Sequence, residues 1–88
     1  MTNTRLKDEL ERLRSEVKEL AAENVEATEK LEALISDLEK KLEEPANRDH
    51  HATLVEHLKE YISQLETEHP RATAILNEIM VTLSNMGI

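Results

Sequence analysis

Residues 6–42 read LKDELERLRSEVKELAAENVEATEKLEALISDLEKKL, and the apolar positions in this stretch decide the fold. Successive positions alternate between steps of four and three residues, which is the heptad spacing of an α-helix that buries one side against another helix. The lattice runs through Leu6, Leu10, Leu13, Val17, Leu20, Asn24, Ala27, Leu31, Leu34, Leu38 and Lys41. The pattern therefore predicts helical association and indicates no chemical activity.

The composition agrees with an all-α protein of one small domain. The chain has 88 residues, of which 39% are hydrophobic, and its one aromatic residue is Tyr61. A single glycine, two prolines and many Glu, Leu and Lys residues are typical of long helices and coiled coils. The core of such a chain has to be built from many shallow leucine contacts.

Charge and cysteine content exclude several classes of partner. The net charge is −8, from 19 acidic and 11 basic residues, so we expect no nucleic-acid binding. Cysteine is absent, which removes disulfides and thiolate metal sites. No apolar run approaches the roughly 20 residues that span a bilayer, so we expect no membrane insertion. The polar opening MTNTRLKDE does not resemble a signal peptide, and we expect a cytoplasmic protein.

The helix boundaries follow from breakers and capping residues. We expect a helix over about 4–43, a linker over 44–47 around Pro45, a helix over about 48–68 and a last helix over about 70–86 that begins at Pro70. The first helix has a weak join at 21–24, where alanines and Asn24 bury little. Either the helix continues through Asn24, or it breaks there and Asn24 caps a second helix.

The length of the first helix favours an oligomer. A continuous helix over 6–42 would be about 55 Å long, whereas a compact domain of this size is about 30 Å across. We therefore predict an elongated helical hairpin, bent at Pro70 in its second arm, that pairs with a copy of itself into a helical-bundle homodimer. The alternative is a compact bundle of four short helices. The predicted oligomer interface consists of Leu6, Leu10, Leu13, Val17, Leu20, Asn24, Leu31, Leu34 and Leu38.

The last helix places most of its apolar residues on one arc and leaves Ala74 and Val81 on the opposite side. Its end predicts a Schellman stop, in which Gly87 takes the left-handed conformation and Ile88 folds back on Leu83.

The same region carries a family resemblance. The sequence resembles the C-terminal signature of the small bacterial proteins grouped as the domain-of-unknown-function family numbered 4404. The residues that carry it are His69-Pro70, the helix from Ile75 to Leu83, and Asn85-Met86-Gly87-Ile88. The resemblance implies a bacterial helical protein and no activity, cofactor or functional residue. Members interrupt the first helical region with a short polar or proline-containing stretch, and the join at 21–24 lacks a proline.

The histidines are the candidates for chemistry. Glu66-x-x-His69 has the spacing of a carboxylate metal site on a helix, and His50 and His57 lie one heptad apart. Such a site needs a second motif, which only a symmetry mate would supply, so we expect no metal or other cofactor. The sequence also contains no glycine-rich phosphate loop and no evident nucleophile with its base.

We therefore expect a non-enzymatic module that self-associates through its leucine heptads. A second copy is the expected partner, with another helical protein as the next candidate. A bundle that binds a metal or a small molecule through His and Glu residues is the alternative function.

Overall fold

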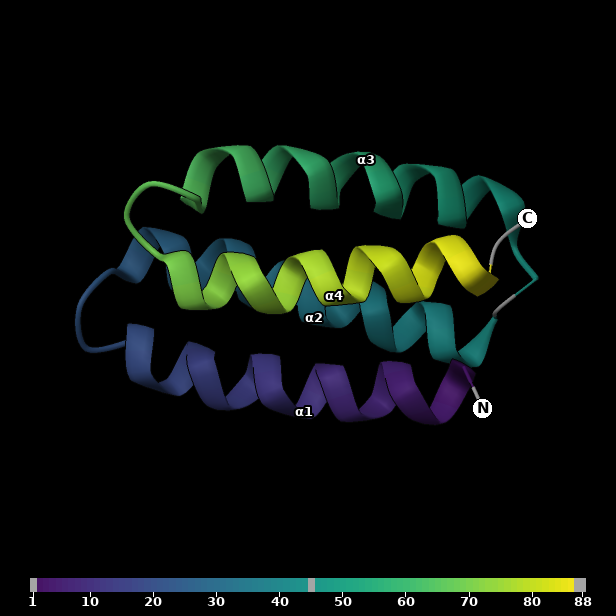
Figure 1. The fold of residues 1–88 in the computed structure, drawn as a ribbon, viewed down its shortest axis with the longest axis horizontal. Coiled ribbons are helices and arrows are strands. Elements are labelled where there is room, and N and C mark those ends of the chain that lie inside the picture. The colour runs from purple at the N-terminus through teal and green to yellow at the C-terminus, as the bar shows by residue number, and fades with distance from the viewer. Residues whose placement is uncertain (1, 45, 87–88) are drawn as a thin grey trace.

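The structure, a computed structural model, describes residues 2–44 and 46–86. These residues form four α-helices and the connections between them (Figure 1). α1 spans Thr2–Leu20, α2 spans Val25–Glu43, α3 spans Arg48–Leu65 and α4 spans Pro70–Met86. These residues include no β-strand, which confirms the all-α prediction.

Successive helices run antiparallel and form a ring. α1 packs on α2 and α4, and α3 packs on the same two helices. In Figure 1, α4 lies in front of α2, and the α1–α2 and α3–α4 connections lie at the end opposite the α2–α3 connection. This is an up-and-down four-helix arrangement, in which short connections make chain neighbours into packing neighbours.

The first helical region is broken, so the predicted elongated hairpin is wrong. α1 ends at Leu20, and the backbone N–H of Asn24 still donates to the Leu20 carbonyl at 2.8 Å. Asn24 itself is extended, with φ −148° and ψ 98°, and its Oδ1 accepts from the N–H of Ala27 at 3.0 Å. Ala21 and Ala22 are exposed, so a helix continued through them would bury almost no apolar surface. The alternative reading, a bundle of four short helices with Asn24 as a cap, describes the structure.

The dimensions agree with a bundle that closes on itself. The principal extents are 36 × 21 × 18 Å and the radius of gyration is 12.2 Å. A compact single chain of this length has a radius of gyration of about 12 Å. The fold therefore needs no second copy to reach the compactness of a globular domain.

Seventeen apolar residues from all four helices form one core. Its members are Leu6, Leu10, Leu13, Val17, Leu20, Ala27, Leu31, Leu34, Leu38, Leu54, Leu58, Leu65, Ala72, Ile75, Leu76, Ile79 and Leu83. The buried polar residues are Glu9, Thr28, Lys41, His51, Thr73 and Thr82. The threonines donate from their hydroxyls to carbonyls four residues earlier, which lie in the same helix or directly before it, so their hydroxyls are satisfied locally.

The remaining helix ends are set by local signals. Asn47 caps α3 by accepting from the N–H of His50 at 3.0 Å. α3 ends at Leu65, three residues short of the expected 68, and Glu66 follows as its C-cap. Of the predicted C-terminal cap, Leu83 is buried in the core, whereas Gly87 and Ile88 lie outside the described residues.

Candidate functional site

The residues predicted to form an oligomer interface lie inside one chain. The eight apolar members are at most 6% exposed, and they pack between the helices of the same bundle. Asn24, the ninth member, is partly buried and serves as the cap of α2. The structure therefore places the eight apolar members in the core of the bundle.

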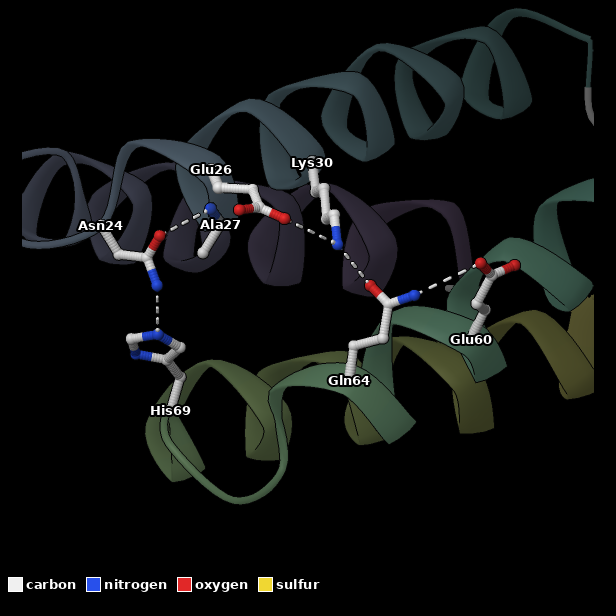
Figure 2. A network of polar contacts seen from close by, with 7 residues as sticks. All are labelled: Asn24, Glu26, Ala27, Lys30, Glu60, Gln64 and His69. Carbon is white, nitrogen blue, oxygen red and sulfur yellow. Dashed lines mark hydrogen bonds and ion pairs between the residues drawn. The ribbon is translucent and has the colours of Figure 1, made fainter.

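Asn24 also joins the two connections at one end of the bundle. Its Nδ2 lies 3.1 Å from Nε2 of His69, the residue before α4 (Figure 2). Because the Asn24 oxygen already accepts from Ala27, its amide nitrogen must donate, and Nε2 of His69 must accept. This contact requires a neutral His69 imidazole that carries its proton on Nδ1.

A second polar network ties α2 to α3. Lys30 Nζ donates to Oε1 of Gln64 at 2.7 Å and lies 3.6 Å from Oε1 of Glu26 (Figure 2). Gln64 Nε2 in turn donates to Oε1 of Glu60 at 3.3 Å. These side chains are largely exposed, so we expect their contacts to contribute little to the free energy of unfolding and to help align α2 with α3.

The predicted histidine candidates do not converge. His69 turns to Asn24, while Glu66 is exposed at the end of α3. His57 Nδ1 lies 3.7 Å from Asp37 Oδ2, and its ring centroid is 6.3 Å from that of Tyr61. Within residues 2–44 and 46–86, no group of three or more His, Asp or Glu residues is arranged to hold a metal ion.

The corner between α2 and α3 holds buried titratable groups that the sequence analysis did not single out as a site. Lys41 is 1% exposed and His51 is 6% exposed. Burial lowers the pKa of the Lys41 ammonium group. Burial also lowers the pKa of His51, and the positive charge of Lys41 and the neighbouring His50 lower it further. Lys41 occupies a heptad core position, and this was the available signal that a charged group would be buried here.

Both histidines of this corner have ring nitrogens without hydrogen-bond partners. The unpaired atoms are Nδ1 of His51 and both ring nitrogens of His50. A buried imidazole that forms no hydrogen bond is more easily accommodated as the neutral ring than as the cation. The unpaired Nδ1 of the buried His51 thus agrees with the lowered pKa of this residue.

A groove lies between α1 and α2, on the opposite side of α1 from α4. Charged side chains dominate its lining, which includes Lys7, Glu11, Arg14 and Glu39 together with Leu10 and Leu42. Arg14 pairs with Glu39 across the groove. The groove therefore presents a largely charged surface.

The outward side of α4 differs from the rest of the surface. We call Pro70, Ala74, Asn77, Val81 and Ser84 the α4 stripe; all five are exposed and uncharged. Val81 is 53% exposed, and among the side chains whose burial the structure describes the other large exposed hydrophobic residue is Val25 at 66%, which begins α2. In Figure 1, no other helix lies in front of α4. The sequence had placed Ala74 and Val81 opposite the apolar arc of this helix, and this was the signal for the stripe.

The fold and these surfaces define an antiparallel four-helix bundle protein. No helix among the described residues combines the length and the apolar character that crossing a bilayer requires. The chain belongs to the family described as Domain of unknown function (DUF4404), whose model matches residues 6–88. The resemblance noted at the C-terminal end is thus confirmed over nearly the whole chain. No curated protein and no solved structure matches the chain.

Proposed function

We propose that this protein is a non-enzymatic helical module that self-associates. The α4 stripe carries the proposal, because it is an exposed, charge-free surface on a chain whose net charge is −8. Charged residues are depleted at the centres of protein interfaces, so a charge-free helix face is the part of this surface best suited to contact with another protein. A cytoplasmic location, expected from the sequence, is part of the same proposal.

The proposal differs from the sequence expectation in the surface that is used. The leucine heptads stabilise the bundle itself, since they are buried between helices of one chain. Self-association must then use outward-facing side chains. It brings together two bundles that are each already folded, and neither needs the other to complete its core. Such an interface is smaller than an obligate one, so we expect reversible association with a dissociation constant in the micromolar range.

Molar mass in solution tests the proposal. Light scattering on size-exclusion fractions, loaded from micromolar to millimolar concentration, should give a mass that rises from 10.1 kDa towards at least twice that value. Circular dichroism of the same fractions should show a fully helical protein throughout. A folded monomer over the whole concentration range would contradict self-association.

A further inference from the structure

The two connections that meet at one end of the bundle are built alike around Asn24 and His69. The backbone N–H of each residue donates to the carbonyl of the last residue of the preceding helix, at 2.8 Å in both cases. The carbonyl of each accepts from the N–H and the hydroxyl of a threonine four positions later, Thr28 for Asn24 and Thr73 for His69. Because the backbone is held on both sides, a change in the contact between Asn24 and His69 has to be taken up by the two side chains.

The side-chain amide of Asn24 has one oxygen, and that oxygen is already in use. Oδ1 accepts from the N–H of Ala27 at 3.0 Å, while Nδ2 lies 3.1 Å from Nε2 of His69 (Figure 2). The amide nitrogen only donates, and a neutral imidazole that carries its proton on Nδ1 accepts at Nε2. The α2 cap and the contact with His69 therefore coexist while the ring is neutral.

A proton on the ring replaces this acceptor with a donor. Both nitrogens of an imidazolium carry hydrogen, so Nε2–H of His69 would face the N–H groups of Asn24 Nδ2. A half-turn of the amide removes the conflict, because it brings Oδ1 to His69 and Nδ2 to the N–H of Ala27. Hydrogen bonds to a charged group are roughly twice as strong as neutral ones. The imidazolium therefore takes the oxygen from Ala27.

Loss of the oxygen falls on the first turn of α2. The first N–H groups of a helix have no partner within the helix, and Asn24 Oδ1 satisfies the one at Ala27. Ala27 is 3% exposed, so this N–H lies where water does not readily replace the lost acceptor. Val25, which begins the helix, is 66% exposed, so little packing holds the turn in place. The turn has to open to hydrate the N–H group.

The charged groups around this contact keep their charge while an imidazole titrates. The ends of α1 and α3 and the starts of α2 and α4 meet here (Figure 1). The ion pairs at this end join Arg71 to Glu19 and Lys30 to Glu26, and neither includes His69. Carboxylates, ammonium and guanidinium groups stay charged between pH 7 and about 5.5, where histidine changes charge. The exposed charged residues of this end are Glu19, Glu23, Glu26, Glu66, Glu68 and Arg71.

We propose that His69 is a proton-dependent switch of the α2 cap: the neutral ring leaves Asn24 Oδ1 on Ala27, and the imidazolium takes this oxygen and releases the first turn of α2. A proton bound in the connection between α3 and α4 thereby changes the start of α2, 45 residues earlier in the chain. The switch lies within one bundle, so it does not depend on self-association.

The tautomer of the neutral ring gives the first test. Long-range proton–nitrogen correlation spectra of the histidine rings, recorded above pH 7, should show His69 with its hydrogen on Nδ1 and a free acceptor at Nε2. The His69→Gln variant assigns the resonance by its loss. A ring that carries its hydrogen on Nε2 would overturn the proposal, because that nitrogen then could not accept from Asn24.

Hydrogen exchange of the Ala27 amide tests the switch itself. After correction for the pH dependence of intrinsic exchange, protection of this amide should fall by about fivefold between pH 7 and 5.5, the value of one helix cap. The fall should follow the titration of the His69 ring resonance. In His69→Gln, whose side chain does not titrate, protection should stay constant relative to the wild type, although His51 is present in both chains. An equal fall in both chains, or none in the wild type while His69 titrates, would overturn the switch.

Asn24→Asp is the variant that separates competition for the oxygen from a general effect of acid. A carboxylate has two oxygens, so one accepts from Ala27 while the other accepts from the imidazolium. Protection of the Ala27 amide should then be retained or increased at pH 5.5. A fall as large as in the wild type would overturn the proposed competition.

Discussion

Asn24 Nδ2 lies 3.1 Å from Nε2 of His69, and this contact joins two connections that are 45 residues apart in the chain. The same asparagine caps α2 through its oxygen. One side chain thus begins a helix and holds the α1–α2 connection to the residue that precedes α4. Both roles require the break in the first helical region, so the contact accounts for a lattice position that carries Asn where its neighbours are apolar.

The first prediction concerns this asparagine. Asn24→Ala should lower the free energy of unfolding by about 1–2 kcal/mol, because it removes the helix cap and the contact with His69. Asn24→Ser is the matched control, since serine retains a capping oxygen but cannot reach the imidazole, and its loss should be smaller. Urea unfolding measures both. Equal stability of the wild type and Asn24→Ala would show that the α2 cap contributes nothing.

The second prediction tests the assignment of the heptad leucines to the core. Leu13 is fully buried, so Leu13→Ala should cost about 2–5 kcal/mol through lost burial and the cavity left behind. Val25→Ala, at an exposed site, should stay within about 0.5 kcal/mol of the wild type. Both variants should keep the wild-type association constant. If Leu13→Ala abolished the dimer while the chain stayed folded, the heptad leucines would have to form the dimer interface, and their assignment to the core would be wrong.

The third prediction is a pH dependence of stability that comes from His51. Its pKa is lowered in the folded state, so the unfolded chain binds more protons as the pH falls below about 6.5. The free energy of unfolding should therefore decrease on acidification from pH 7 to about 5.5. Lys41 does not contribute over this range, because its amine titrates at alkaline pH. Its pKa is lowered from 10.5 in the folded state, so the free energy of unfolding should increase as the pH rises towards 10.5.

Two histidine variants isolate this effect. His51→Gln should reduce the slope of stability against pH between 7 and about 5.5, since the residue that loses stability on protonation is gone. His57→Gln, on the same helix but 47% exposed at its side chain, should leave most of the slope in place. Thermal unfolding at matched ionic strength gives the comparison. Identical slopes for the wild type and His51→Gln would contradict a role for the buried corner.

The fourth prediction separates the proposed function from its metal-binding rival. Protein purified without chelators should contain iron, zinc and manganese only well below one equivalent per chain. Elemental analysis measures this, and chelation should leave the melting temperature unchanged. Stoichiometric metal that is lost in His69→Ala would instead support the Glu66-x-x-His69 motif, completed by a second copy.

The sequence by itself determined which residues are buried. Helical periodicity is a local property, so the steps of four and three residues identify Leu6, Leu13 and Leu34 as buried without any knowledge of the partner. The same lattice placed Lys41 among the core positions, and it is 1% exposed. The change of direction around residues 44–47 also follows from local chemistry, since Pro45 disfavours a helix at the residue before it.

Only the tertiary structure decided what covers those residues. A leucine stripe buries the same area against its own chain as against a copy, so its spacing cannot distinguish a bundle core from a dimer interface. The contact of Asn24 with His69, which lies far away in the sequence, forms only when α3 has returned along α2. In the same way, the packing of α4 on α1 brings Arg71 to Glu19 and Glu78 to Arg12, and the sequence of α4 alone does not specify these partners.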